Sequence, residues 1–285
     1  MSEAVPPRRR RRLPRAALLC LPVAAFLLVF FLTPLVLNGF TSLRGADGAF
    51  SLRSYVRLLG DPYYLGVTAN TLWVSALVTF AALVIGYPVA YVLANHAGRL
   101  APLVIFLLIA PLLTSTIMRT YGWQVLFARR GMLNVLLRDW GVIERPLAIL
   151  QQALSVYIGL VHVLVPFMVL SIAAVLQNID PKLKESARVL GAGRFRTFWS
   201  VTLPLSLDGV ATGSILTFMV ANGSFVTMLL LGDGKVVTLP VLIFQQFTLT
   251  RDMHFASAMG NVLLAVAVAC LSLQLRLVRR RGVER

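Results

Sequence analysis

Six apolar runs, each about as long as a helix that crosses a lipid bilayer, constrain the fold of this 285-residue chain more than any other feature. A helix needs roughly 20 mainly apolar residues to span the hydrocarbon core. The runs are 16–37, 68–94, 100–118, 153–176, 210–231 and 255–275. Charged residues make up 13% of the chain, whereas soluble domains carry about 25%. The sequence therefore predicts an all-α integral membrane protein with six transmembrane helices.

The basic residues predict which side of the membrane each loop faces, because Lys and Arg gather on the cytoplasmic side. With both termini in the cytoplasm, 17 of the 27 Lys and Arg residues lie on that side. We expect basic cytoplasmic tails at 1–15 and 276–285, a six-span domain over 16–275, and a cytoplasmic loop at 177–209. The first run is longer than the apolar core of a signal peptide, so we expect it to remain as a span. The basic tails should bind anionic lipid rather than nucleic acid.

The chain lacks the residues with which it could power transport or catalyse a reaction. It has no GxxxxGK[ST] phosphate loop, and its three histidines, His96, His162 and His254, fall in different segments. The six apolar runs contain no Asp or Glu, whereas proton-driven carriers generally need ionisable groups at that depth. The sequence predicts a protein that is not an enzyme, binds no metal or cofactor, and depends on another subunit for ATP hydrolysis.

The loop 177–209 has the pattern of two short helices separated by glycine. Asp180 and Pro181 form a helix start, in which an oxygen cap precedes a proline at the first helical position. Gly191 and Gly193 then interrupt the helical pattern, and residues 194–203 can form a second helix before Pro204 leads into the next span. Its mixture of carboxylate, arginine and aromatic groups is typical of a protein-binding contact. A hairpin lying on lipid headgroups is the alternative.

The same loop carries a family motif. Glu185, Ser186 and Ala187 are followed at fixed spacing by Gly191, Val201, Leu203 and Pro204. This arrangement resembles the motif E-A-A, three residues, G, nine residues, I-x-L-P of the inner-membrane permeases of binding-protein-dependent ABC importers. The segments 119–134, 159–180 and 224–232 resemble the spermidine/putrescine-type subgroup of those permeases.

The resemblance implies a type I ABC importer permease bundle in the bacterial inner membrane, in which the loop is a coupling helix docked on an ATPase. The motif residues would make that contact, with Glu185 pairing a cation on the ATPase and Gly191 permitting the turn. The implied partners are two ATP-binding cassette subunits, a second permease and a solute-binding protein outside the cytoplasm. A structural membrane subunit without a path and a secondary carrier are the alternatives.

Polar residues within the predicted spans indicate where a solute could pass. Asn222, Gly223 and Ser224 lie past the midpoint of the fifth span, and His162 lies in the fourth. Polar groups at this depth favour the interior of the bundle, where they could line a path or hold helices together. The spermidine/putrescine-type subgroup often has an acidic residue where this chain has Ser224. The sequence therefore leaves open whether the solute is a polyamine or another small organic molecule.

Overall fold

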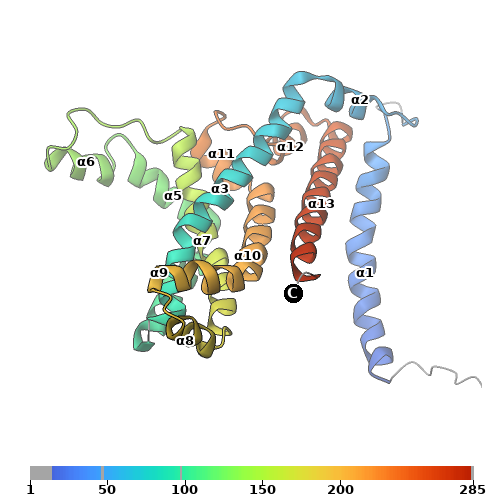
Figure 1. Cartoon of the computed structure of the whole chain (residues 1–285). Coiled ribbons are helices and arrows are strands. Elements are labelled where there is room, and N and C mark those ends of the chain that lie inside the picture. Colours follow the sequence, from blue (N-terminus) through green and yellow to red (C-terminus); the bar gives the residue numbers. More distant parts are fainter. Residues whose placement is uncertain (1–14, 46–47, 97, 284–285) are drawn as a thin grey trace, which may run out of the picture.

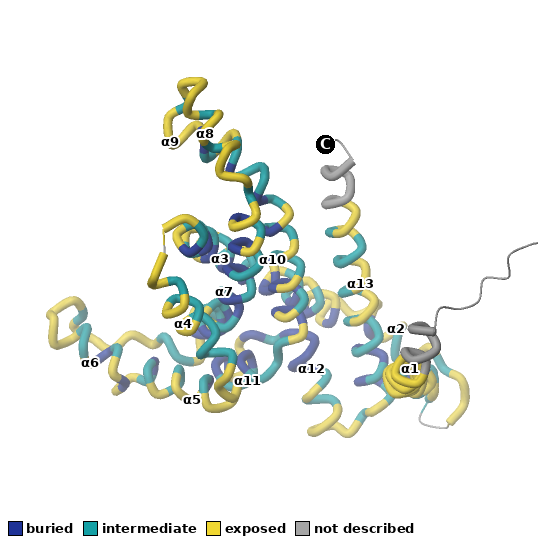
Figure 2. Tube along the Cα trace, turned by 90° about the horizontal axis from the view of Figure 1, so that it is seen from below, coloured by how far each residue is buried: buried dark blue, intermediate teal, exposed yellow. Residues whose placement is uncertain are grey.

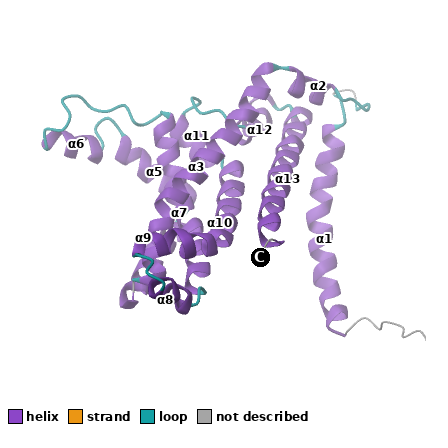
Figure 3. Cartoon of the chain, in the orientation of Figure 1, coloured by secondary structure: helices purple, strands orange, loops and turns teal. Residues whose placement is uncertain are grey.

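The computed structural model describes residues 15–45, 48–96 and 98–283, and these residues are almost entirely helical (Figures 1 and 3). Within these described ranges, five helices are long and apolar enough to cross a membrane. They are α1 (Arg15–Ser42), α3 (Pro62–Asn95), α7 (Ala153–Gln177), α10 (Leu203–Gly223) and α13 (Met253–Val283). Four of the six predicted spans lie within single helices of this set, which confirms the all-α membrane fold.

The remaining helices of the described chain are short. They are α2 (Arg53–Gly60), α4 (Ala101–Leu113), α5 (Thr116–Phe127), α6 (Met132–Asp139), α8 (Pro181–Val189), α9 (Arg194–Thr197), α11 (Val226–Gly232) and α12 (Leu239–Gln245), with single turns η1 (Gly98–Leu100), η2 (Phe198–Thr202) and η3 (Gln246–Thr250). In Figure 1, α8 and α9 lie at the lower end, and α2, α11 and α12 lie at the upper end. These ends are called the α8 end and the α2 end below.

The prediction that residues 100–118 form one continuous helix is wrong. α4 ends at Leu113, and the chain resumes as α5 after a bend of 99°. Thr114 and Ser115 are extended, and the Thr114 hydroxyl donates to the Pro111 carbonyl at 2.8 Å. A side chain thus satisfies a carbonyl that the ended helix leaves free. Over the described residues, the number of candidate spans reaches six when this bent pair counts as one.

The fifth predicted span, 210–231, is also displaced. α10 begins at Leu203, seven residues before the predicted start, and ends at Gly223; α11 follows after a break at Ser224. Pro204 lies in the first turn of α10, and the π-helical turn η2 leads into that turn without a break. There the Leu203 N–H donates to the Phe198 carbonyl, which widens the helix where a proline ring would otherwise meet the preceding turn.

The core of the bundle is the contact of α7 with α3 and α10. Gly209 allows α10 to approach α7 closely, because a Cβ there would lie 2.9 Å from the Ser171 carbonyl oxygen. Gly213 and Gly86 face Met168 of α7 in the same way. Small residues at such crossings let helix backbones pack tightly in a membrane. α1 lies at the edge of the bundle, beside α13, and from Val23 onward most of its large apolar side chains are exposed (Figure 2).

The predicted basic tails fall largely outside the described residues. Residues 1–14, including the arginine run 8–12, are not described, and α1 begins at Arg15. At the other end α13 continues through Val283, so most of 276–285 extends a helix. The division into tails and a six-span domain therefore stays a prediction.

Candidate functional site: the α8–α9 loop and the break after α10

α8 begins at the cap that the sequence predicts. The Asp180 side chain accepts a hydrogen bond from the Lys182 N–H at 2.9 Å, and Pro181 occupies the first turn, where its missing N–H costs nothing. The Lys184 ammonium donates to Asn95 Oδ1 at the end of α3, at 2.6 Å. Burial, followed by the nearby charge of Arg188, lowers the pKa of Lys184. The loop is thus fastened to α3 from its first turn.

Gly191 forms the turn that ends α8. Its φ is +83°, in the left-handed region that side chains other than glycine resist. Its N–H donates to the Arg188 carbonyl at 2.9 Å, and the Ala192 N–H donates to the Ala187 carbonyl at 3.0 Å. These two bonds form a Schellman motif, which closes a helix at a glycine. Gly193, by contrast, has an ordinary φ of −63°.

The turn presents an apolar surface that nothing in the described chain covers. Val189 is 86% exposed, Leu190 87% and Phe195 78%. Glu185 and Ser186 are exposed on α8, and Ala187 is half-buried. Figure 2 shows that α8 and α9 project from the bundle and are mostly exposed. Apolar side chains gathered at such a projecting point mark a contact site. We call Glu185, Ser186, Val189, Leu190 and Phe195 the α8 surface.

The second half of the motif lies elsewhere. Val201 is in the η2 turn, and Leu203 and Pro204 begin α10; all three are half-buried. The structure therefore brings Glu185, Ser186, Ala187 and Gly191 together in one helix and its terminal turn. It places the other three motif residues in the helix that leads into the bundle.

Phe198 joins the loop to α3. Its ring lies 5.8 Å from the Tyr87 ring and 5.7 Å from the Tyr91 ring, edge-on to both. Tyr87 and Tyr91 are one helical turn apart on α3, so both face the η2 turn. The hydroxyls of Tyr87 and Ser206 are also hydrogen-bonded, at 2.8 Å. We call Tyr87, Tyr91 and Phe198 the aromatic clamp. The sequence analysis missed it, although the spacing of the two tyrosines signals a shared face.

The predicted path residues of the fifth span lie at a helix break. Asn222 is 2% exposed, and its Oδ1 has no hydrogen-bond partner among the described residues. Gly223 is the last residue of α10, and the Ser224 hydroxyl donates to the Val220 carbonyl at 2.9 Å. The next side chain, Phe225, stacks on Phe244 at 5.5 Å. These residues therefore lie at the break between α10 and α11, instead of inside one continuous helix.

His162 lies apart from this break. It is an exposed residue of α7, and its ring is 5.3 Å from the ring of Trp123 on α5. It lines an open groove of about 510 Å³ between α3, α4 and α7, whose other lining side chains are almost all apolar. Asn222, Gly223 and Ser224 do not line that groove. The structure thus separates the predicted path residues into two places. Among the described residues, no cluster of His, Cys, Asp or Glu could hold a metal ion.

The comparison with protein families is decisive. A family described as "Binding-protein-dependent transport system inner membrane component" matches residues 16–282. This chain belongs to that family. The prediction of a permease subunit of an ABC importer is confirmed, and the loop motif that carried it lies inside the matched region.

Two named relatives are permeases of one kind. The chain is 36% identical over 250 residues to the spermidine/putrescine transport system permease protein PotB of Escherichia coli, covering 86% of this chain and 90% of that protein. It is 34% identical over 255 residues to PotB of Haemophilus influenzae, covering 86% and 89%. These matches bear out the resemblance to the spermidine/putrescine-type subgroup.

Solved structures give the same fold. A chain of a bacterial ABC transporter involved in the import of alginate superposes with a TM-score of 0.80, at 18% identity, covering 93% of this chain and 95% of that one. A second structure, a bacterial alginate ABC transporter in complex with an alginate pentasaccharide-bound periplasmic protein, gives a TM-score of 0.78 at 19% identity. The helical arrangement described above is therefore that of ABC importer membrane subunits.

Proposed function

We propose that this chain forms part of the transmembrane path for a small organic solute and is driven by ATPase subunits that bind at the α8 surface. The α8 end then faces the cytoplasm of the bacterial cell, with both termini on that side. The basic residues of the 177–209 loop support this orientation.

The observation that carries the proposal is the geometry of the α8 turn. It exposes Val189, Leu190 and Phe195 beside Glu185, while the reverse side of the loop is fastened to α3 through Lys184 and the aromatic clamp. A surface so built can bind a second protein and pass a displacement into the bundle. Glu185 would pair with a cation on the ATPase, and the Gly191 turn would hold the apolar residues in place.

The same geometry requires further partners. The groove beside His162 is open, so a closed path needs a second permease subunit. A relative's structure was solved with a periplasmic solute-bound protein, and the family is described as binding-protein-dependent. We expect the α2 end to receive a solute-binding protein, and two ATPase subunits to bind the paired permeases.

The chemical class of the solute is inferred from the break after α10. A buried amide oxygen without a partner costs about 1–3 kcal/mol, so the Asn222 oxygen is available to a polar group of a solute. Broken spans of this kind expose backbone groups at transporter binding sites. The relatives are named for spermidine and putrescine, but this chain has Ser224 and no carboxylate in its predicted spans. The proposed cargo is a polyamine-like or other small organic solute held mainly by neutral polar groups.

The docking proposal is tested by co-purification with the ATPase subunits. Glu185→Lys and Gly191→Asp should both abolish co-purification and solute uptake, because one reverses a charge on the α8 surface and the other strains its turn. Membrane insertion should be unchanged. Normal co-purification of both variants would contradict the docking assignment.

The solute is tested separately, by measuring binding of polyamines, amino acids, sugars and anions to the partner solute-binding protein. Tight binding of something other than a polyamine would reject the polyamine while leaving the docking proposal intact. Uptake by vesicles without any ATPase subunit would instead indicate a secondary carrier. A complex that assembles and takes up solute normally when this chain's path residues are substituted would indicate a structural subunit.

A further inference from the structure

The short helix α2 carries a stripe of exposed apolar side chains at the α2 end. Leu52 is 51% exposed, Val56 70% and Leu59 57%, and the preceding Phe50 is 74% exposed. Leu52, Val56 and Leu59 are separated by four and three residues, so they share one side of the helix. The next side of the helix carries Arg53 and Arg57. We call Phe50, Leu52, Val56 and Leu59 the α2 stripe.

The opposite side of α2 is fastened to three other helices, which fixes its rotation. Leu58 is 1% exposed and packs with Tyr64 and Phe255. The Tyr55 hydroxyl is hydrogen-bonded to the Ser42 hydroxyl at 2.8 Å and accepts from Asn261 Nδ2 at 3.0 Å. Because these contacts join α2 to α1, α3 and α13, the α2 stripe has to point away from the bundle.

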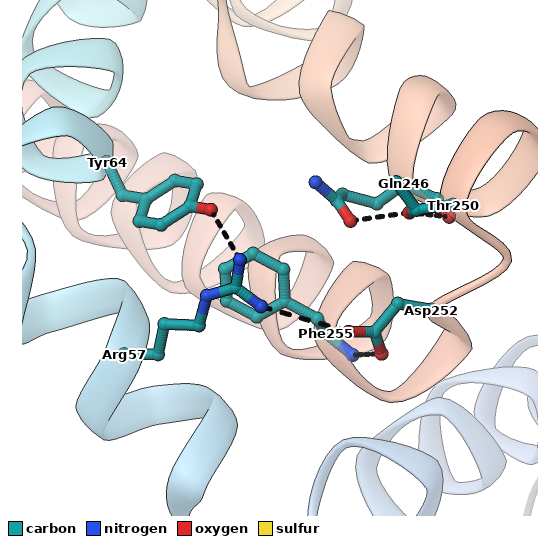
Figure 4. Close-up of polar contacts among 6 residues, drawn as sticks. All are labelled: Arg57, Tyr64, Gln246, Thr250, Asp252 and Phe255. Carbon is teal, nitrogen blue, oxygen red and sulfur yellow. Dashed lines mark hydrogen bonds and ion pairs between the residues drawn. The ribbon is translucent and has the colours of Figure 1, made fainter.

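Arg57 adds a further attachment, which Figure 4 shows. Its Nη2 donates to the Tyr64 hydroxyl at 3.1 Å, and its Nη1 lies 4.0 Å from Asp252 Oδ2. The guanidinium carbon lies 4.4 Å from the centroid of the Phe255 ring, a cation–π contact. Asp252 is itself held, because its Oδ1 accepts the Phe255 N–H at 3.0 Å. Arg57 is thus held against Tyr64 and Phe255 although its side chain remains 53% exposed, and Arg53 is also exposed.

We propose that α2 lies in the headgroup layer of the membrane, with the α2 stripe among the acyl chains and Arg53 beside lipid phosphates. On the orientation proposed above, this is the outer leaflet. An apolar side next to a basic side is the composition of helices that lie in the interface plane. A short helix packed on a bundle needs little affinity of its own to stay there.

Two features favour lipid over a protein partner. The upper part of α1 also exposes apolar side chains, since Val36, Leu37 and Phe40 are 52%, 59% and 60% exposed, and Figure 1 shows α2 beside the upper ends of α1 and α3. In the described chain, the Arg53 guanidinium has no carboxylate within ion-pair distance. A phosphate would supply the missing charge, as basic side chains near a bilayer generally bind anionic headgroups.

The test measures the depth of α2 in the bilayer. Single cysteines are placed at Val56 and Leu59 in a chain carrying Cys20→Ser and Cys270→Ser, spin-labelled, and studied in the assembled transporter in nanodiscs of phosphatidylethanolamine and phosphatidylglycerol. Leu28, in the middle of α1, and Glu144, in an exposed loop, serve as reference positions. Both α2 labels should be more accessible to oxygen than to a water-soluble nickel complex, as at Leu28 and opposite to Glu144.

The other outcomes overturn the proposal. If the labels at Val56 and Leu59 have the same accessibility to oxygen and nickel as the label at Glu144, the α2 stripe lies in water. Labels that are immobile and shielded from both reagents place it under a protein, either the second permease or the binding protein. These results are independent of ATPase docking, which co-purification measures by itself.

A second measurement tests Arg53. The Val56 label should move deeper when phosphatidylglycerol replaces zwitterionic lipid, and Arg53→Gln should remove that shift. Arg138→Gln, which changes an exposed arginine of α6, is the matched control and should keep it. An unchanged lipid response in Arg53→Gln would reject the phosphate contact.

Discussion

Replacing Phe198 with alanine should separate ATP hydrolysis from solute uptake. Phe198 is not on the α8 surface; it is half-buried between that surface and α3, with its ring edge-on to Tyr87 and Tyr91. Phe198→Ala removes both ring contacts and leaves Glu185 and the Gly191 turn in place. The ATPase subunits should therefore still bind, but their motion should reach α3 less effectively.

The size of the effect follows from the two contacts. An edge-to-face aromatic pair contributes about 0.5–1.5 kcal/mol. Losing two such pairs therefore removes about 1–3 kcal/mol from the free energy that holds the α8–α9 loop against α3. A coupling free energy of that size corresponds to a change of about 5–150-fold between linked sites. We expect the number of solute molecules taken up per ATP hydrolysed to fall by at least about fivefold.

The assay uses the assembled transporter in proteoliposomes, with solute-loaded binding protein on one side and ATP on the other. Uptake and phosphate release are measured on the same sample, so that their ratio reports coupling. Phe195→Ala is the matched control, because its side chain is 78% exposed and belongs to the α8 surface. That variant should reduce ATPase binding and both rates, while the ratio stays unchanged.

Either of two results would refute this role of Phe198. If Phe198→Ala keeps the wild-type ratio of uptake to hydrolysis, with the complex intact, the aromatic clamp does not transmit motion. If Phe198→Ala loses the ATPase subunits altogether, the clamp shapes the docking surface instead of linking it to α3.

Three further substitutions test other parts of the structure. Gly191→Ala should strain the α8 turn by about 1–2 kcal/mol and weaken ATPase co-purification, whereas Gly193→Ala, at an ordinary φ, should not. Gly209→Ala should lower the free energy of unfolding of the detergent-solubilised protein by about 1–3 kcal/mol, because the added Cβ would lie 2.9 Å from an α7 carbonyl oxygen. Gly223→Ala is the control, because there is open space around Gly223, and it should melt at the wild-type temperature. Asn222→Leu should reduce uptake with the ATPase still bound, and wild-type uptake would remove Asn222 from the path.

Much of the α8–α9 loop could be predicted because its signals are local. An aspartate cap, a proline at the first helical position and a glycine at the end of a helix each act through the backbone of a few neighbouring residues, and the structure shows the expected bonds at Asp180 and Gly191. The family motif added the function. The aromatic clamp could not be predicted with the same ease, because Phe198 and Tyr87 are far apart in the sequence.

The errors in the spans have a common cause. Hydropathy detects that a segment is apolar, but it does not detect where a helix breaks inside an apolar segment. The extended residues Thr114 and Ser115 and the break at Ser224 all lie within or beside apolar runs. Pro204 was expected to lead into the fifth span, and it does lie in the first turn of α10, but the π-helical turn η2 joins that turn to the preceding helix without a break.

The length of α10 has a mechanical consequence. α10 has 21 residues, Leu203–Gly223, and is therefore about 32 Å long at 1.5 Å per residue. One end adjoins the η2 turn and the α8–α9 loop, and the other end lies next to Asn222. A helix of that length converts a tilt of only about 5° into a displacement of about 3 Å at its far end. A solute site at the break could therefore be opened or closed by a rotation too small to disturb the packing near its pivot.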